Sequence, residues 1–424
     1  MKIIIIGGGI SGCAAYLQLK KHLPTPPSST QHDITIYESH DTSINATHEQ
    51  RDGETYSSTL IIGGGLGVLP NGLNVLKRLD EGLLRDIVCG GYAIASQNLR
   101  SKNGTLLVRI DPTAVDEDGK LMHLLGISRH SLWWGLRTRI PDRDMRTKKV
   151  SRVVAREDGR NEVHFADGSP FVEADLVIGA DGVKGVSKLA LLSEADEVDL
   201  YKPIYQGLVG VGGFISTEEV QSLVEEGSMN LVFGGNGFFG YFFSEIVAQL
   251  RERHAHWKDP VIQRILGSLE VKNMFPTWTS PQLPMWERDG VVLIGDAAHA
   301  LPSTSGQGSS QALEDAEAFV MLLCHWLRLA YQEPLLDAMA YKRAITMAAK
   351  QYEEIRRPRV QSILENAQRM QNTKRSMGVI AEYCMYCAMW LAGRFTGLMS
   401  RPLQRVNKYN IAEEVKAFIE RQTR

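Results

Sequence analysis

The first twelve residues, MKIIIIGGGISG, constrain the fold of this chain more than any other segment. Four consecutive isoleucines at positions 3–6 are typical of a strand buried on both faces of a parallel sheet. Gly7, Gly9 and Gly12 follow at the spacing G-x-G-x-x-G, and residues 13–21 have helical character. In such a unit the first glycine permits a tight turn, the second lets a phosphate approach the backbone, and the third lets the helix pack closely on the strand. Because N–H groups at the helix start also face the phosphates, the segment predicts a dinucleotide site rather than a glycine-rich turn without a ligand.

Composition and charge exclude several classes of function. The 424 residues are 43% hydrophobic and 23% charged, which is typical of a globular protein with room for two or three domains. The formal net charge of −2 at pH 7 leaves no electrostatic footprint for nucleic acid. The five cysteines are odd in number and scattered, which argues against a disulfide framework. Glycines from position 7 onward interrupt what could otherwise resemble a signal peptide, so we expect a cytoplasmic protein.

An acidic residue ends the second predicted strand. Residues 33–38 read DITIYE, and Glu38 lies 26 positions after Gly12 because a proline- and serine-rich segment at 23–31 lengthens the connection. A carboxylate at this strand end accepts hydrogen bonds from an adenosine ribose, and its charge disfavours a 2′-phosphate. The alternative is a solvated glutamate without a ligand. A further glycine-rich segment at 60–67 lacks the final glycine, so we do not interpret it as a second dinucleotide site.

The rest of the chain alternates strand and helix signals. Predicted strands occupy residues 99–110, 121–126, 149–156, 161–165, 174–179 and 290–294. Predicted helices occupy residues 71–79, 82–88, 129–137, 245–254, 260–269, 309–330 and 335–357. Ser128 is expected to cap one of these helices. Residues 200–245 are rich in β-branched residues, aromatic residues and glycine, and they predict strands of a separate sheet at 208–215, 229–233 and 238–243.

A final apolar stretch occupies residues 379–395. Because Glu382 lies within it and Arg394 near its end, the stretch falls short of the roughly 18 uninterrupted apolar residues of a membrane span. We expect a helix packed on the protein, with a membrane-surface helix as the alternative. Cys384 and Cys387 are expected to be packed thiols rather than a redox or metal pair, since no βαβ unit surrounds them.

Two further motifs have the pattern of a strand that runs into an acidic turn. They are GADGV at 179–183 and GDAAHALPSTSGQGSSQALEDA at 295–316. A strand that ends in Gly-Asp places a carboxylate at the carboxyl edge of a sheet, where α/β folds bind ligands, and a carboxylate accepts hydrogen bonds from sugar hydroxyls. The alternative for Asp296 is that it only caps the next helix.

The three motifs in this order, beginning with GGGISG at 7–12, carry a resemblance to a known family. The chain resembles the FAD-dependent single-component (group A) flavoprotein monooxygenases of aromatic-hydroxylase or salicylate-hydroxylase type. Within that family it is most similar to fungal enzymes of secondary metabolism. The resemblance covers about residues 1–370, and the segment of the predicted middle sheet matches least well.

The resemblance implies a role for each matching residue. Residues that would hold the pyrophosphate and the adenosine ribose of FAD are Gly7, Gly9, Ser11, Gly12 and Glu38. Asp181 and Gly182 would lie near the pyrophosphate and near the approach of the nicotinamide cofactor. Residues that would contact the ribityl chain or the flavin ring are Arg129, Gly295, Asp296, Pro302, Gly306, Gly308 and Ser309. The helix that begins at Ser309 would point its positive end at the pyrimidine edge of the ring.

The resemblance also implies a reaction. FAD would be tightly bound, and NADPH or NADH would act as a transient co-substrate, because the chain has no second dinucleotide fingerprint. Oxygen would add at C4a of the reduced flavin, and the hydroperoxide would hydroxylate or epoxidise a small organic substrate of aromatic, polyketide, terpenoid or alkaloid type. No side chain stands out as a catalytic base, and His130 and His299 are expected to be structural. No metal site and no obligate protein partner are predicted.

Two features depart from the family pattern. The second motif usually continues with serine and ends in arginine, but Gly185 and Lys188 stand at these places, which affects the nicotinamide-side contact more than FAD binding. After GFFGY at 237–241 the chain passes almost directly into a predicted helix. The substrate sheet is therefore expected to be shorter by a hairpin, through either a truncated gene product or a more open pocket.

The expected fold class is α/β, with a Rossmann-like FAD-binding domain of para-hydroxybenzoate-hydroxylase type, an interleaved β-sheet substrate domain and C-terminal helices. The predicted division is an FAD-binding domain of residues 1–75, 100–195 and 285–370, a substrate domain of 76–99 and 196–284, and a C-terminal helical region of 371–424. Two alternative functions remain open. One is an FAD-dependent reductase or dehydrogenase of the same fold, and the other is an inactive flavin-binding homologue.

Overall fold

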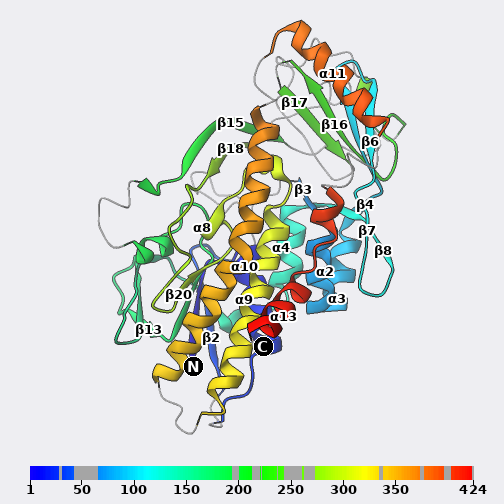
Figure 1. Cartoon of the computed structure of the whole chain (residues 1–424). Coiled ribbons are helices and arrows are strands. Elements are labelled where there is room, and N and C mark those ends of the chain that lie inside the picture. The colour runs from blue at the N-terminus through cyan, green and yellow to red at the C-terminus, as the bar shows by residue number, and fades with distance from the viewer. Residues whose placement is uncertain are drawn as a thin grey trace.

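The computed structural model is drawn in Figure 1 with its helices and strands labelled. It describes residues 1–27, 31–42, 65–192, 200–212, 220, 222–235, 237–242, 260–261, 273–333, 338–372, 377–395 and 403–422. The predicted helix at 245–254, most of the one at 260–269 and most of the glycine-rich segment at 60–67 lie outside these residues. The predicted shortening of the chain after GFFGY also falls outside them.

A six-stranded sheet forms around the N-terminal strand. Its order is β10-β2-β1-β14-β20-β19, and neighbouring strands are parallel except for β19 and β20. The strands are β1 (Lys2–Ile6), β2 (Asp33–Glu38), β10 (Met145–Thr147), β14 (Leu176–Gly179), β19 (Glu287–Arg288) and β20 (Val291–Leu293). Ile3, Ile4 and Ile5 are fully buried, as their sequence predicted. Each of these side chains stabilises the fold by about 1.5–3 kcal/mol through its burial.

Helices connect the strands and cover the sheet. Among them, α1 (Ile10–His22) packs on α9 (Gly308–Ala330), and α9 packs on the long α10 (Ala338–Asn372), which runs along the front of the molecule in Figure 1. The remaining helices of this region are α2 (Pro70–Leu79), α3 (Glu81–Cys89), α4 (Arg129–Arg137), α8 (Asp296–His299) and α13 (Ile411–Gln422), with short 3-10 turns at η1 (Asp142–Asp144), η2 (Ser187–Leu191) and η4 (Ser303–Ser305). The predicted cap of α4 is confirmed, because the Ser131 backbone N–H donates to Oγ of Ser128 at 2.9 Å.

A second group of strands lies at the far end of the molecule from the chain termini (Figure 1). Four strands form a sheet in the order β17-β16-β5-β6, namely β5 (Ser96–Ser101), β6 (Leu106–Ile110), β16 (Ser228–Gly234) and β17 (Gly237–Phe242). Helix α11 (Val379–Gly393) packs on the outer strand β6. A separate antiparallel pair consists of β15 (Ile204–Gly212) and β18 (Asn273–Thr279).

Three small sheets complete the described fold. In the first, β3 (Gly65–Val68) and β4 (Gly91–Ile94) lie on either side of β9 (Leu124–Ser128). The second is a meander of β11 (Val150–Val154), β12 (Asn161–Phe165) and β13 (Val172–Ala174). The third is the pair β7 (Ala114–Val115) and β8 (Leu121–Met122). The meander contains the strand pair that the sequence predicted around Asp158-Gly159.

The α/β class is confirmed, but several local predictions are wrong. Residues 99–110 do not form one strand, because a turn at Gly104, whose φ is +85°, reverses the chain between β5 and β6. The strands predicted for one separate sheet divide between two sheets, since β15 pairs with β18 whereas β16 pairs with β5. Cys384 and Cys387 are exposed rather than packed, because the face of α11 that carries them points away from β6.

Two packing relations bear on the division into domains, which stays a prediction. Buried leucines of α2 and α3 belong to the same core as the six-stranded sheet. Strand β5 pairs directly with β16, so segments far apart in the sequence build the four-stranded sheet of β5, β6, β16 and β17 together. We call it the outer sheet. Over the part of the chain that the structure describes, no helix has the length and apolar character needed to cross a bilayer.

Candidate cofactor site

The three sequence motifs meet at one edge of the six-stranded sheet. Strands β1, β2, β14 and β20 are parallel and in register, so their carboxyl ends lie side by side. The turns at these ends carry Gly7, Glu38, Asp181 and Asp296. Open parallel sheets bind their ligands at this edge. The structure therefore brings together residues that the sequence only suggested belonged to one site.

The three glycines of the first turn have different steric surroundings. Gly7 has a φ of +100°, and a Cβ added there would lie 2.4 Å from the Ala180 carbonyl oxygen. A Cβ at Gly12 would lie 1.9 Å from the Gly7 carbonyl oxygen, so α1 can approach β1 only without a side chain there. At Gly9, by contrast, no described atom lies within 4 Å of the Cβ position. The backbone at Gly9 is therefore accessible to a bulky group such as a pyrophosphate.

The Glu38 carboxylate is fixed against this turn. Its Oε2 accepts a hydrogen bond from the Gly8 backbone N–H at 2.7 Å, and its Oε1 accepts one from the His40 backbone N–H at 3.1 Å. Burial acts to raise the pKa of Glu38, but the hydrogen bonds from His40, Gly8 and Ser39 outweigh it and hold the pKa below its ordinary value. At neutral pH the end of β2 thus presents an ionised, acceptor-only group.

Two side chains that the sequence analysis missed hold the first turn from its other side. The Gly8 carbonyl oxygen accepts hydrogen bonds from Nε1 of Trp133 at 2.8 Å and from Sγ of Cys13 at 3.2 Å. Trp133 lies on α4 and is fully buried. Helix α4, which also carries Arg129, is therefore attached directly to the glycine turn.

The second motif forms a self-contained loop around Asp181. Oδ2 of Asp181 accepts hydrogen bonds from the backbone N–H and the hydroxyl of Ser187, at 2.9 and 3.0 Å. Its Oδ1 is buried and has no hydrogen-bond partner among the described residues. Burial raises the pKa of Asp181, although the hydrogen bonds from Ser187 act against this rise. This oxygen faces Gly185 within the loop.

Gly185 and Lys188, the two residues that depart from the family pattern in this motif, both lie in the Asp181 loop. A Cβ at Gly185 would lie 2.1 Å from Cγ of Asp181, so the glycine leaves the space that the carboxylate occupies. Nζ of Lys188 donates to the Val183 carbonyl oxygen at 2.7 Å and closes the loop. Burial lowers the pKa of Lys188. Gly182 has a φ of +77°, and its Cβ position faces open space within the described chain.

The third motif places Asp296 within the electrostatic influence of Arg129. The Asp296 side chain is exposed, yet the surrounding protein desolvates it enough to raise its pKa. The charges of Arg129 and His299 act to lower that pKa, so both lie near the carboxylate. A Cβ at Gly295 would lie 2.2 Å from Oγ of Ser11, so this turn also packs against the start of α1.

The segment after α8 leads to the start of α9. Pro302 is buried, and Gly306 adopts a left-handed conformation with φ of +61°. The Cβ positions of Gly306 and Gly308 have no described atom within 4 Å. The Ser309 hydroxyl donates to the Gly67 carbonyl oxygen at 3.4 Å. Helix α9 is 23 residues long, and its N-terminal partial positive charge lies beside this open glycine backbone.

A buried ionic cluster behind the third motif was not predicted. Nε of Arg356 lies 2.8 Å from Oδ1 of Asp315, and Nη1 of Arg356 lies 2.5 Å from Oε2 of Glu314. The side chains of these three residues are fully buried. Burial alone would raise the pKa of Asp315, but His299 and Arg356 hold it well below its ordinary range. The only signal in the sequence is a pair of adjacent acidic residues in the apolar stretch of α9.

This cluster positions the turn that carries Asp296. Oδ2 of Asp315 accepts a hydrogen bond from the Gly295 backbone N–H at 2.8 Å and lies 2.6 Å from Nε2 of His299. Asp315 therefore fixes both ends of α8, and Asp296 lies between them. This contact of His299 with Asp315 fits the structural role that the sequence predicted for the histidine.

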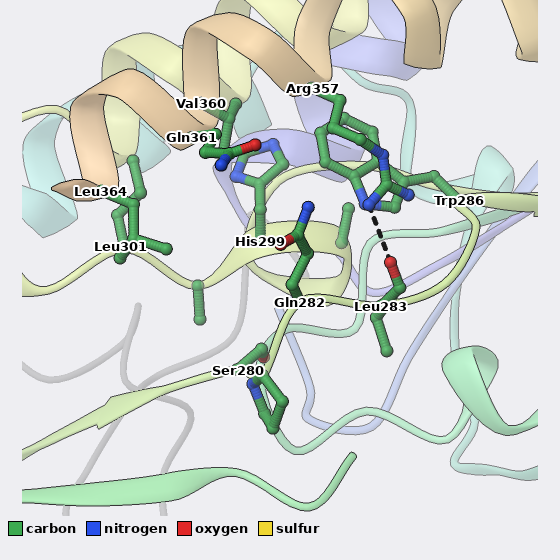
Figure 2. Close-up of a pocket in the computed structure, with 13 residues that line it drawn as sticks. Ser280, Gln282, Leu283, Trp286, His299, Leu301, Arg357, Val360, Gln361 and Leu364 are labelled. Atoms are coloured by element: carbon green, nitrogen blue, oxygen red, sulfur yellow. Dashed lines mark hydrogen bonds between the residues drawn. The ribbon is translucent and has the colours of Figure 1, made fainter. Parts of the chain in front are cut away.

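A shallow recess lies beside the third motif (Figure 2). It is bordered by His299 and Leu301, by Trp286 and by the face of α10 that carries Arg357 and Val360. The Arg357 guanidinium donates to the Leu283 carbonyl oxygen at 2.8 Å and lies 5.1 Å from the Trp286 ring centroid. None of the residues that line this recess is a predicted cofactor residue.

The geometry at the sheet edge fits FAD. An ionised acceptor, Glu38, lies at one end, and the carboxylates of Asp181 and Asp296 lie farther along the same edge. Glycine backbone with no described atom within 4 Å of its Cβ position lies between these carboxylates at Gly9 and beside them at Gly306. A dinucleotide carries hydroxyl-rich sugar groups on either side of a pyrophosphate. Carboxylates can accept hydrogen bonds from the hydroxyls, and the backbone N–H groups between the carboxylates can donate to the pyrophosphate.

Comparisons with known proteins point to the same cofactor. A family profile described as an FAD binding domain matches residues 258–367. The FAD-dependent urate hydroxylase of Klebsiella oxytoca is 25% identical over 87% of this chain and 89% of its own length. The 3-amino-4-hydroxybenzoate 2-monooxygenase PtmB3 of Streptomyces platensis is 23% identical over 85% of each chain.

Solved structures share the fold of the whole chain. A substrate complex of salicylate hydroxylase superposes with a TM-score of 0.69 at 18% identity and covers 98% of this chain and 97% of its own. Klebsiella pneumoniae HpxO, solved with FAD and uric acid, gives a TM-score of 0.68 at 19% identity over 95% and 96% of the two chains. With three motifs at one sheet edge, a matching FAD-binding profile and relatives that align along most of their length, we conclude that the chain is an FAD-dependent monooxygenase with the fold of salicylate hydroxylase.

Proposed function

We propose that this protein hydroxylates a small, planar organic molecule with NAD(P)H and O2 as co-substrates. The observation that carries the proposal is the convergence of Glu38, Asp181 and Asp296 around open glycine backbone at one sheet edge. When bound, FAD supplies the transfer of two electrons from the nicotinamide and the activation of oxygen. The protein supplies binding, orientation and electrostatics.

The proposed binding residues act at different parts of the cofactor. The first turn, with Gly7, Gly9, Ser11 and Gly12, would hold the pyrophosphate through backbone N–H groups. Glu38 would accept hydrogen bonds from the adenosine ribose, and Asp296 would accept them from the ribityl chain. Asp181 and Gly182 would lie between these two ends.

The ring end of the site would be formed by the segment from Pro302 to Ser309. Exposed backbone at Gly306 and Gly308 can approach a flat ring closely because no Cβ intervenes. The N-terminus of α9 favours negative charge at this place, and Arg129 adds a formal positive charge near Asp296. The same two features would stabilise an anionic ring without a dedicated catalytic side chain.

The proposed substrate class rests on the relatives. By their names, two of them act on 3-amino-4-hydroxybenzoate and on urate, which are both small planar rings that carry electron-donating groups. Aromatic side chains such as Phe239 and Tyr241 occupy the outer sheet, where the chain differs most from its family pattern. We propose a substrate of this planar type. The proposal concerns the substrate class alone.

The test is product formation under ¹⁸O₂ with NADPH and NADH and a panel of hydroxylated and aminated aromatic acids and purines. Incorporation of one labelled oxygen atom into the product is expected. A reduced or desaturated product without label would contradict oxygen insertion and favour the reductase or dehydrogenase alternative. Bound FAD without substrate-stimulated oxidation of either nicotinamide across the panel would instead favour an inactive homologue.

A further inference from the structure

The side chain of Gln307 lies at the ring end of the proposed FAD site, where α9 begins. It stands between Gly306 and Gly308, whose Cβ positions have no described atom within 4 Å. Gln307 is 4% exposed. Its Nε2 has no hydrogen-bond partner among the described residues, yet it is not one of the fully buried unpartnered atoms, so it reaches accessible surface. Gln307 thus presents an amide donor without a described acceptor beside open glycine backbone.

Capping of α9 does not explain this glutamine. Gln307 is the N-cap residue, but its side chain makes no capping hydrogen bond. Ser, Thr, Asp and Asn are the residues whose side chains cap helices effectively. The Gln307 amide oxygen instead accepts a hydrogen bond from Nε2 of Gln311, one turn farther along α9, at 3.1 Å.

A buried arginine fixes which way the Gln307 amide points. Nη2 of Arg356 donates to Oε1 of Gln311 at 2.6 Å. A guanidinium has donors only, so Gln311 must turn its oxygen to Arg356 and its nitrogen to Gln307. Gln307 then accepts with Oε1, which leaves Nε2 as its outward atom. Gln311 and Arg356 are both fully buried, so a reversed amide would leave hydrogen bonds unmade in the core.

Asn71 imposes the same orientation from α2. Its Nδ2 donates to Oε1 of Glu314 at 2.6 Å and lies 3.5 Å from Oε1 of Gln307. Burial acts to raise the pKa of Glu314, but Arg359 and Arg356 hold that pKa below its ordinary value. The carboxylate is therefore ionised and only accepts, which keeps the Asn71 nitrogen in place. A reversed Gln307 amide would set its N–H groups against those of Asn71.

We propose that Gln307 donates a hydrogen bond from Nε2 to an acceptor of the flavin ring, and that Gln311 and Arg356 are positioning residues that hold its amide in the donating orientation. The proposal rests on the proposed placement of the ring along residues 302–309. It does not depend on which substrate is hydroxylated.

Such a contact would favour the reduced cofactor. A hydride from NAD(P)H delivers two electrons and one proton, so the neutral ring gains one net negative charge on reduction. Hydrogen bonds to a charged acceptor are stronger than those between neutral groups. Nε2 of Gln307 would therefore stabilise reduced FAD more than oxidised FAD and raise its reduction potential.

The test is the reduction potential of FAD bound to the full-length protein, measured without substrate by equilibration with a reference dye. Gln307→Met removes the donor at similar side-chain volume. We expect it to weaken the binding of reduced relative to oxidised FAD by about tenfold, which lowers the potential of this two-electron couple by about 30 mV. Gln311→Met frees the Gln307 amide to turn and should lower the potential by a smaller amount. In the Gln307→Met background the same Gln311 substitution should have no further effect.

Gln311→Glu is a second variant that keeps an acceptor for Arg356 and so protects the fold. Because its carboxylate cannot donate to Gln307, the Gln307 amide should reverse. The potential should therefore fall more in the wild-type background than in the Gln307→Met background. Flavin content and melting temperature show whether each variant is folded and loaded.

A matched control lies near the other end of α9. Gln351 of α10 is 7% exposed and accepts a hydrogen bond from Nε1 of Trp326 at 2.8 Å. Trp326 is roughly 28 Å from Gln307 along α9, at about 1.5 Å per residue. Gln351→Met should therefore leave the potential unchanged.

An unchanged potential in Gln307→Met would overturn the proposed hydrogen bond, and so would a shift of the same size in Gln351→Met. Equal shifts from Gln311→Met, or from Gln311→Glu, in both backgrounds would overturn the positioning role. Since these measurements use neither substrate nor oxygen, a failure to hydroxylate any compound would count against the proposed function alone.

Discussion

At the scale of single residues, steric surroundings separate glycines that the motif treats alike. Gly12 is needed for packing, because a methyl group there would overlap the Gly7 carbonyl oxygen. Gly9 faces open space and is needed only if a ligand approaches it. Gly12 is therefore required for folding, whereas Gly9 is required for binding a ligand.

Alanine variants of these glycines should behave differently. Gly12→Ala should lower the free energy of unfolding of the ligand-free protein by about 3 kcal/mol or more, since overpacking against backbone leaves no side chain to move aside. Gly9→Ala should leave that stability within about 1 kcal/mol and weaken FAD binding instead. Urea unfolding of the apoprotein and FAD titration measure the two effects. Equal stability loss in both variants would contradict this distinction.

Gly185 leads to a counterintuitive prediction. Gly185→Ser restores the residue that the family pattern has at this place, yet the new Cβ would lie on the Asp181 carboxyl group. We expect a loss of about 1–3 kcal/mol in stability and a lower affinity for FAD. Denaturant unfolding and flavin titration check this result. A Gly185→Ser variant that is as stable as the wild type would contradict the prediction. It would show that the Asp181 carboxyl group does not need the space that the missing Gly185 side chain leaves.

At the scale of elements, helices α9 and α10 are joined by charges in the core. Glu314 and Asp315 from α9 surround the Arg356 guanidinium from α10, and Asp315 also holds the Gly295 turn. Removing one partner of a buried ion pair leaves an uncompensated charge, which typically costs about 3–5 kcal/mol. The cluster couples the packing of the two longest helices to the position of Asp296.

Arg356→Met should therefore lower the free energy of unfolding by about 3–5 kcal/mol. Asp315→Asn should lower it less, because Glu314 still balances Arg356, but it should also weaken FAD binding through the Gly295 turn. Thermal and urea unfolding with and without FAD separate the two contributions. Arg328→Met, on the exposed end of α9, is the control and should have little effect. An unchanged affinity for FAD in Asp315→Asn would contradict the positioning role of Asp315.

The cluster also predicts a pH dependence. The pKa of Asp315 is lower in the folded protein than its ordinary value of 3.8, so its contribution to stability is fully present above that value. The contribution is lost as the pH falls below 3.8 toward the lower pKa of the folded state. Between pH 5 and pH 3 the wild type should therefore lose more stability than Asp315→Asn. Parallel stability curves over this range would contradict the assignment.

Local patterns could be predicted from the sequence, and pairings between distant segments could not. The strand at 33–38 and the Ser128 cap depend on neighbouring residues, and both were found where expected. Strand β18 was missed because its segment contains Pro276, which weakens a strand signal. The Arg356 cluster was missed because one helix supplies the acids and another the base. The space at Gly185 depends on how the loop folds back onto Asp181.

At the scale of the whole molecule, two regions with different tasks are joined by long-range pairings. The six-stranded sheet and its helices present the cofactor edge, whereas the outer sheet of β5, β6, β16 and β17 carries α11. We propose that residues 76–89 belong with the FAD-binding region, because α2 and α3 share its core. The boundary predicted at residue 100 falls within the β5–β6 hairpin, so we propose that residues up to 110 belong with the outer sheet. The remaining predicted boundaries are retained as a proposal.

One sheet edge is expected to hold both ends of FAD. Glu38 would contact only the adenosine half, which FMN lacks. The most direct measurement is therefore the affinity of the apoprotein for FAD and for FMN, in the wild type and in Glu38→Gln. We expect one FAD per chain, weaker binding of FMN, and a loss of about tenfold or more in FAD affinity in the variant with FMN affinity unchanged, as for one charge-assisted hydrogen bond. Equal weakening of FAD and FMN in Glu38→Gln, or equal affinity of the wild type for both flavins, would contradict the account.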